Sequence, residues 1–387
     1  MTSSLMSSLF AVSSSVQHED RLELTAEPSI ETVLTAVRIL HDPASSQEER
    51  SYASKFLTAI QSSPCAWLLA DQLLIAKPDI QSTYFAAQTI RYKIQTCFAS
   101  ELQVQQHESL RDSLITHLNQ IAASSQADQQ QIRVIVNQLS LSLAYLTILD
   151  ASWSDPLVSL MNQVTDPMVR LQILTYVPEE IVDCGQSSSS AGNEDVRDAR
   201  LRGVGSNRRR QVIRYLGHVS HSMIQHLTQL AQGLTAGTGS TDPTHNHREK
   251  AMIFRAFASW IHVLFTDHEF ANPEEFANHK AMTSDQKIVE LRKKLDLCYP
   301  ILFILITSQN NTKAEDDEHD SSADALTAFL SCFFHSDPVQ DLSCDIISGT
   351  TSVHKLSEEQ TQLLSACCGI VTGILNLDSA FLSASKY

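Results

Sequence analysis

The chain has 387 residues, of which 43% are hydrophobic and 6% are aromatic. This composition can bury a large core, but the length exceeds what one compact domain usually holds, which favours several domains or a repeat array. The formal net charge is −16, from 44 acidic and 28 basic residues, and it disfavours direct binding to nucleic acid or to an anionic membrane surface.

Glycine and proline number only 11 each, well below average usages of about 7% and 5%, which predicts an all-α protein. The eight cysteines are scattered without a C-x-x-C pair, a pattern typical of a reduced intracellular chain. No segment reaches the roughly 20 apolar residues of a membrane span, so no membrane insertion is expected. The Ser-rich residues 1–28 are predicted to form a disordered N-terminal tail.

Residues 29–184 are predicted to form successive helix pairs, because apolar residues recur there at helical spacing between breakers such as Asp42-Pro43. The expected helices are Ser29–Leu40, Ser45–Gln61, Cys65–Ala76, Asp79–Phe98, Gln106–Ser124, Gln126–Leu149, Asp155–Val164 and Asp166–Ile181. Each pair occupies roughly 35 to 45 residues, within the range of HEAT-type repeats. The pattern favours a right-handed superhelical arch of helical repeats over a globular bundle.

The second half of the chain has the same character but is interrupted more often. Residues 185–206, Ser-rich and then of mixed charge, are predicted to be a disordered insertion. Residues 207–387 are expected to form further HEAT-like repeats, with loop insertions near 236–247, 267–286 and 309–322. The expected helices are Asn207–Leu234, Glu249–Phe265, Gln286–Ser308, Ser321–His335 and Ser357–Leu377.

A colinear series of short blocks carries a family resemblance. The blocks are Ala53 to Ile60, Pro64-Cys65-Ala66-Trp67, Asp71-Gln72-Leu73-Leu74, Tyr84 to Ile90, Lys93-Ile94-Gln95, Ser109 to Leu114, Leu139 to Leu146, Ser152-Trp153, Tyr176-Val177-Pro178-Glu179-Glu180 (a turn), Asn207-Arg208-Arg209 and Ser259-Trp260. Their order resembles the N-terminal part of importin-beta-type karyopherins, and within that superfamily transportin-SR and its importin-thirteen relatives. The resemblance covers about Ile30 to Phe265 well and the remainder weakly.

The resemblance implies a nuclear transport receptor that shuttles between cytoplasm and nucleus. Such a receptor binds the GTP form of the small GTPase Ran through its N-terminal repeats, imports protein cargo such as Arg/Ser-rich splicing factors, and contacts nucleoporins. Members of the family are roughly twice as long or more, so the chain is expected to lack the C-terminal repeats that recognise most cargo. The alternative is a HEAT-repeat scaffold of a stable protein complex, with no role in transport.

In the family that the chain resembles, the second helix of each pair lines the concave surface. A polar stripe beside the apolar stripe of that helix is therefore the expected contact with Ran. The stripe on the segment 79–98 is Tyr84, Gln88, Arg91 and Gln95; the matching positions are Ser51, Ser54 and Thr58 on the earlier helix, and Arg133, Asn137 and Ser140 on the later one. The alternative is that these residues form only a solvated helix face.

The acidic run of Glu315, Asp316, Asp317 and Glu318 is a second candidate, since related receptors hold the basic side of Ran with an acidic loop; ordinary disorder is the alternative.

No pattern indicates catalysis, a metal site or a cofactor. His218, His221 and His226 share a helix, but at most two lie on one face and no acidic ligand is near. Phosphate-binding glycine loops and nucleophile elbows are absent from the sequence. The chain is therefore expected not to be an enzyme.

Overall fold

The computed structural model describes residues 28–123, 129–183, 206–235, 243–266, 280–309 and 316–336, with shorter stretches between 278 and 365. Within these residues the regular elements are α-helices, which confirms the predicted all-α class. Two compact units divide the chain, residues 1–208 (unit 1) and residues 209–387 (unit 2). The predicted N-terminal tail and the insertion at 185–206 lie almost wholly outside the described residues.

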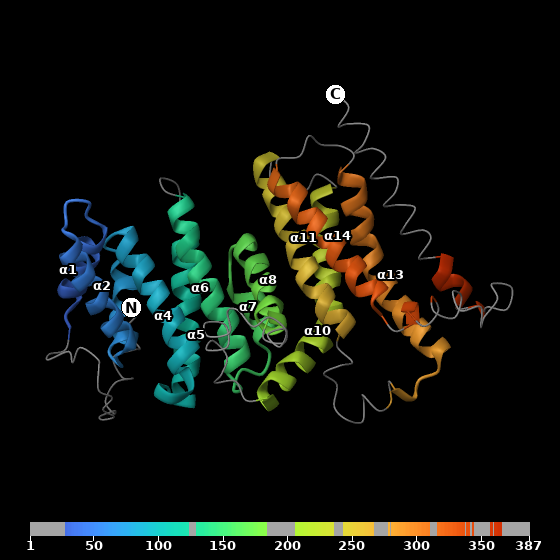
Figure 1. The fold of residues 1–387 in the computed structure, drawn as a ribbon, viewed down its shortest axis with the longest axis horizontal. Helices are drawn as coiled ribbons and strands as arrows, with labels where there is room; N and C mark the ends of the chain where they lie inside the picture. Colours follow the sequence, from blue (N-terminus) through green and yellow to red (C-terminus); the bar gives the residue numbers. More distant parts are fainter. Residues whose placement is uncertain are drawn as a thin grey trace. The chain divides into compact units, whose positions relative to one another are not determined.

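Unit 1 contains four helix pairs in chain order, as the sequence predicts (Figure 1). They are α1 (Ile30–His41) with α2 (Gln47–Ser62), α3 (Ala66–Ala76) with α4 (Ile80–Glu101), α5 (Val104–Ala123) with α6 (Gln129–Leu149), and α7 (Pro156–Gln163) with α8 (Pro167–Asp183). We call α1, α3, α5 and α7 the A helices, and α2, α4, α6 and α8 the B helices. Each A helix packs on the B helix of its own pair.

The B helices also pack on one another in series, α2 on α4, α4 on α6 and α6 on α8. This is the nearest-neighbour packing of a helical repeat array, in which each pair buries its apolar face against the next. Helix α6 illustrates the result. Residues Gln130–Leu149 are long and apolar enough to cross a membrane, yet 61% of the most apolar window is buried inside the protein, as in a core helix.

Local sequence signals explain where several helices begin and end. Ser29 caps α1, Ser46 and Glu49 form a capping box on α2, and Asp79 accepts a hydrogen bond from the backbone N–H of Ser82 at the start of α4. Helix α3 ends at Ala76, and the residue that caps it, Lys77, has a φ of 45°, in the left-handed region that usually favours glycine. The predicted boundaries in unit 1 are therefore correct to within a few residues.

Unit 2 contains α10 (Ser206–Thr235, which begins within unit 1), α11 (Pro243–Thr266), α13 (Ser284–Gln309) and α14 (Asp316–Phe334). Helices α11 and α14 pack closely, with the ring of Phe265 edge-on to that of Phe329 at 6.3 Å. Trp260 and Phe254 are fully buried in the same core.

Two helix starts in unit 2 differ from the predictions. Helix α11 begins at Pro243, inside the loop expected at 236–247, because proline fits the first turn of a helix. Helix α14 begins at Asp316, inside the loop expected at 309–322. Helix α8 runs from Pro167 to Asp183, as the helix expected over Asp166–Ile181 predicts, so the turn that the family resemblance suggested at Tyr176 to Glu180 is helical. The two misplaced starts lie in a Gly-Thr-rich run and in an acidic run, both of which were read as loops.

Candidate protein-interaction face

The solvent-facing stripes of the four B helices form one candidate surface, which we call the B-helix face. On α4 the stripe is Gln81, Phe85, Gln88, Tyr92 and Thr96, at spacings of three or four residues and all exposed or half-buried. The corresponding residues are Ser51, Lys55, Thr58 and Ser62 on α2, Gln130, Val134, Asn137 and Leu141 on α6, and Met168, Gln172 and Tyr176 on α8. Successive B helices therefore offer polar, aromatic and aliphatic side chains to solvent.

The predicted Ran-contact residues fall into three groups by exposure. Ser51, Ser54, Thr58, Gln88 and Arg133 are exposed, and Tyr84, Arg91, Gln95 and Asn137 are half-buried. Ser140 is fully buried at 0% exposure, so it offers no surface to a partner. The exposed positions of α4 are Gln81, Gln88, Thr96, Ala99 and Ser100. Of the predicted stripe on this helix, Gln88 is among them, and Tyr84, Arg91 and Gln95 are half-buried.

Arg91, on the side of α4 next to α6, connects two repeats. Its Nη1 donates to Oε1 of Gln138 on α6 at 3.0 Å, and its guanidinium lies 6.0 Å from the centroid of the Tyr145 ring. The Tyr145 hydroxyl in turn donates to Oε2 of Glu180 on α8 at 2.6 Å. Burial, reinforced by the Glu180 carboxylate, raises the pKa of Tyr145 far above its ordinary value, so the hydroxyl stays protonated.

A second polar contact joins α6 to α8 on the same face. The amide nitrogen of Gln172 donates to Oδ1 of Asn137, and it also lies 2.9 Å from the Tyr176 hydroxyl. Together with Arg91, these contacts link three consecutive B helices through side chains that the sequence marks only as polar. The predicted stripe is therefore partly a set of contacts between repeats, and its exposed members are the ones available to a partner.

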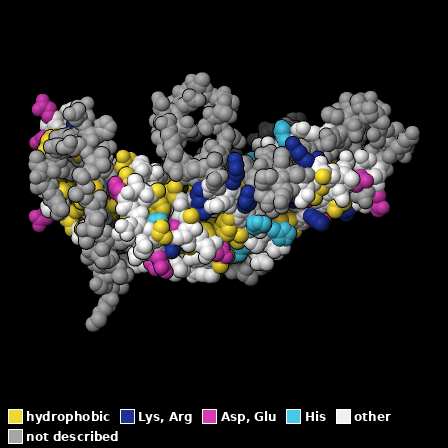
Figure 2. Space-filling model, turned by 90° about the horizontal axis from the view of Figure 1, so that it is seen from below, with side chains coloured by type: hydrophobic (Ala, Val, Ile, Leu, Met, Phe, Trp, Pro, Cys, Tyr) yellow, Lys and Arg dark blue, Asp and Glu magenta, His cyan; other side chains and the backbone are white. Residues whose placement is uncertain are grey.

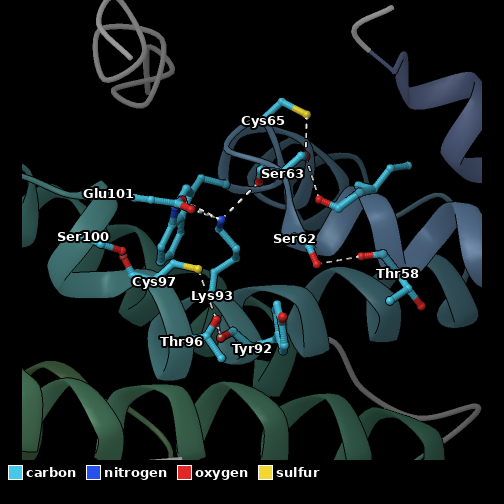
Figure 3. Close-up of polar contacts among 12 residues, drawn as sticks. Thr58, Ser62, Ser63, Cys65, Tyr92, Lys93, Thr96, Cys97, Ser100 and Glu101 are labelled. Atoms are coloured by element: carbon cyan, nitrogen blue, oxygen red, sulfur yellow. Dashed lines mark hydrogen bonds and ion pairs between the residues drawn. The ribbon is translucent and has the colours of Figure 1, made fainter. Parts of the chain in front are cut away.

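Beneath the face, a buried ion pair holds the second repeat together. Lys93 of α4 is 0% exposed, and its Nζ lies 2.7 Å from Oε1 and 2.5 Å from Oε2 of Glu101. The same Nζ donates to the carbonyl oxygen of Ser63 in the turn between α2 and α3, at 3.1 Å. In Figure 3, Lys93 points toward Ser63 and Glu101, whereas Tyr92 and Thr96 lie on another side of the helix. The indole Nε1 of Trp67 completes the cluster by donating to Glu101 at 2.9 Å.

Charge is sparse on the two central B helices. Helices α4 and α6 contain three basic residues, Arg91, Lys93 and Arg133, and one acidic residue, Glu101. The whole chain, by contrast, has a formal net charge of −16. On the side of the molecule shown in Figure 2, the acidic side chains of the described residues are scattered and form no single patch.

The acidic run lies elsewhere than in the expected loop. Asp316, Asp317 and Glu318 form the first turn of α14, in unit 2, and Glu315 lies outside the described residues.

A cluster of Asp71, His117 and Ser113 has the residue types of a hydrolytic triad but not its arrangement. His117 Nε2 lies 2.8 Å from Oδ1 of Asp71, and the Ser113 hydroxyl contacts both Asp71 at 2.9 Å and the same Nε2 at 3.2 Å. A triad instead places the carboxylate on Nδ1 and the serine on Nε2. Asp71 and His117 are also buried, so the cluster ties α3 to α5 and does not face a substrate.

A larger buried network surrounds Asp150, just after α6. Its carboxylate contacts Nδ1 of His107 at 3.0 Å and accepts from Nη1 of Arg111 at 2.8 Å. Burial alone would raise the pKa of Asp150, but hydrogen bonds from Ser152 and His107 outweigh it, so the pKa is lowered. The Arg208 side chain donates to the carbonyl oxygens of Ile148 and Asp150, which caps the end of α6.

Sequence reasoning missed these networks, although one signal was present. Asp71 stands in the otherwise apolar segment Ala66–Ala76, and a carboxylate in such a place needs a buried partner. Among the residues that the structure describes, no group of three or more His, Cys, Asp or Glu side chains could hold a metal ion.

Comparisons with known proteins agree with the helical-repeat architecture. The family model for the exportin 1-like protein matches residues 132–278. Importin-13 from Bos taurus is 29% identical over 167 residues, which is 39% of this chain and 16% of that protein. Exportin-T from Pyricularia oryzae is 26% identical over 187 residues, 43% of this chain and 17% of that protein.

The matched region thus spans only about a sixth of the curated relatives' length. None of these relatives is named as an enzyme. The matches support the predicted kinship with importin-beta superfamily karyopherins.

Proposed function

We propose that this chain is part of a karyopherin that carries proteins between cytoplasm and nucleus, and that the B-helix face of unit 1 binds Ran in its GTP form. The observation that carries the proposal is the series of adjoining B-helix stripes, found in a chain similar to proteins named importin-13 and exportin-T. A specific relation to transportin-SR is part of the same proposal.

The geometry favours a folded protein as the partner of this face. Its exposed side chains come from three successive B helices, with Thr58 on α2, Gln88 on α4 and Arg133 on α6, and α8 adds half-buried ones. With neighbouring helix axes about 8–10 Å apart, these stripes span a surface as wide as a small domain. A small-molecule site would instead need a concave pocket with convergent polar groups.

The proposed cargo is protein, with Arg/Ser-rich segments as the favoured class, and nucleoporins are proposed as further partners. The support for Arg-rich cargo is the net charge of −16, which attracts cationic segments. Binding of an Arg/Ser-rich peptide should therefore weaken as ionic strength rises.

The test compares binding of the 387-residue chain to Ran loaded with a GTP analogue and to Ran loaded with GDP. We expect a strong preference for the GTP form, because the switch segments of a small GTPase are ordered by the γ-phosphate. Changing Thr58 and Gln88 together to arginine should weaken binding by about tenfold or more, because two bulky cations would enter a packed interface.

Gln105→Arg is the matched control, since Gln105 is an exposed glutamine on the A helix α5. It should leave binding unchanged. Equal binding to both nucleotide states would favour the scaffold alternative, and absence of binding to either state would refute the assignment of Ran to this face.

A further inference from the structure

Helix α13 of unit 2 has three large apolar side chains exposed on one face. Tyr299 is 64% exposed, Phe303 58% and Val289 41%. They belong to a set of exposed residues that recurs at alternating spacings of four and three, which we call the α13 stripe: Asp285, Val289, Arg292, Asp296, Tyr299 and Phe303. The buried residues of this helix, such as Leu295 and Cys298, lie on another side, toward α11 and α14.

The spacing of the α13 stripe indicates the shape of its partner. Alternating steps of four and three residues average 3.5, the repeat of two helices that pack along each other's length. Exposed apolar residues gathered on one face, with charged residues among them, are typical of a protein-interaction surface. The partner that the stripe fits is therefore another helix.

The charges of the α13 stripe restrict which helix fits. Arg292 and Asp296 lie at its centre, and among the residues that the structure describes neither side chain makes an ion pair or a hydrogen bond. A uniformly acidic helix would meet Asp296, and a uniformly basic one would meet Arg292, with a like charge. The best partner has one charge of each sign at the centre and an apolar residue on either side.

The α13 stripe itself has that pattern in reverse order. Val289 and Tyr299 lie five residues on either side of Lys294, and Arg292 and Asp296 lie two residues on either side. When two copies of α13 pack antiparallel about a two-fold axis beside position 294, Arg292 of each copy faces Asp296 of the other. Val289 of each copy then faces Tyr299 of the other.

Other arrangements of two α13 helices match less well. A parallel pair places Arg292 against Arg292 and Asp296 against Asp296. Sliding the antiparallel pair by seven residues brings Asp285 opposite Asp296 in one direction, and Arg292 opposite the Phe303 ring in the other. Like charges held opposite each other are unfavourable, so the register about position 294 is preferred.

The outer residues of the α13 stripe are not needed for this pairing. Pro300 lies within α13, and a proline bends a helix. The four central residues all precede Pro300, so they share one straight segment, and only Phe303 lies beyond the bend. At the other end, Asp285 already accepts a hydrogen bond from the Ser357 hydroxyl at 3.0 Å.

We propose that the α13 stripe binds the same stripe of a second copy of this chain, as an antiparallel helix pair about a two-fold axis. The interface contains two ion pairs between Arg292 and Asp296 and two apolar contacts between Val289 and Tyr299. It lies in unit 2, so it goes beyond the proposed binding of Ran to the B-helix face of unit 1 and does not depend on it.

The first experiment is sedimentation equilibrium of the 387-residue chain at about 1–100 μM, the range in which a small interface associates. We expect a reversible dimer. Arg292→Asp and Asp296→Arg each place like charges opposite one another twice, so each should weaken dimerisation at least tenfold. Arg210→Asp, the same change at an exposed arginine of α10, is the control and should leave dimerisation unchanged.

A mixture of the two single variants tests the register directly. In a mixed dimer every central position again faces the opposite charge, so the mixture should dimerise as the original chain does although neither variant does so alone. The double variant Arg292→Asp/Asp296→Arg should also dimerise by itself. Because these positions are exposed, the fold should tolerate all of the changes.

Photocrosslinking tests the direction of the pair. A photoreactive benzoylphenylalanine in place of Tyr299 should crosslink to the segment around Val289 of a second copy. Crosslinking to the segment around Tyr299 would indicate a parallel pair and overturn the inference.

A monomer at about 100 μM, undiminished dimerisation of the single variants, or a mixture that stays monomeric would also overturn it. Binding of Ran in its GTP form by a monomeric chain would refute this inference alone. A dimer that is indifferent to Ran would refute the proposed function alone.

Discussion

Removing Glu101 should cost far more stability than removing the lysine that it faces. Lys93 is completely buried, and its ammonium contacts only two carboxylate oxygens of Glu101 and the Ser63 carbonyl among the described polar groups. Glu101→Ala leaves that charge buried with one neutral acceptor, a change that costs about 3–5 kcal/mol in comparable sites. Lys93→Met removes the charge but keeps the volume, and Glu101 at 23% exposure can be hydrated, so we expect a cost of about 1 kcal/mol or less.

Hydrogen exchange of amides in α3 and α4, read by mass spectrometry, is the measurement, because a repeat array need not unfold in one step. Glu101→Ala should lower the local free energy of opening by the larger amount. The double variant Lys93→Met/Glu101→Gln should recover most of the loss. Lys55→Met, on an exposed position of α2, is the control for losing a lysine. Equal costs for the two single variants would refute the reasoning that an unpaired buried charge dominates.

Three further changes are expected to act on other elements of unit 1. Lys77→Gly should raise stability in urea by about 0.5–1 kcal/mol, because the residue has a φ of 45°. Arg208→Ala should lower it by about 1.5–3 kcal/mol through loss of the carbonyl contacts at the end of α6, whereas the exposed Arg210→Ala should not. The folded-state pKa of Asp150 is lowered, so its contribution is present above about pH 4 and is lost as the pH falls through the folded value. Asp150→Asn should therefore destabilise at pH 7 by about 1–3 kcal/mol, and the difference from the original chain should shrink in urea titrations below about pH 4.

The helices were predictable because their signals are local. Apolar spacing and caps such as Asp79 act within one or two turns, and the structure confirms the eight helices of unit 1. Pro178 lies inside α8, as the apolar spacing over Asp166–Ile181 predicts, although the family resemblance suggested a turn there. The start of α11 at Pro243 was missed because the Gly-Thr-rich run before it indicates a loop, whereas proline fits a first turn, in which its missing N–H needs no partner.

The candidate site was predictable only in part. Whether a polar side chain faces solvent or a neighbouring repeat depends on helices that lie far away in the sequence. The periodicity of α4 identifies a polar side but cannot say which edge of that side meets α6. Arg91 and Asn137 were therefore grouped with exposed residues such as Gln88, whereas both bond to the next repeat. Ser140 is the extreme case, since a small polar residue can be buried in a helix interface at little cost in volume.

In unit 1, the residues expected to determine stability differ in charge from those expected to bind a partner. Buried ionisable side chains make contacts within or between repeats, as Asp71, Lys93 and Asp150 do. The central stripe of α4 keeps uncharged amides and aromatic rings in solvent. Because an exposed neutral side chain contributes little to folding, substitutions such as Gln88→Ala should alter partner binding while leaving the unfolding transition almost unchanged. Substitutions in the buried networks should do the reverse, lowering stability first and binding only as a consequence.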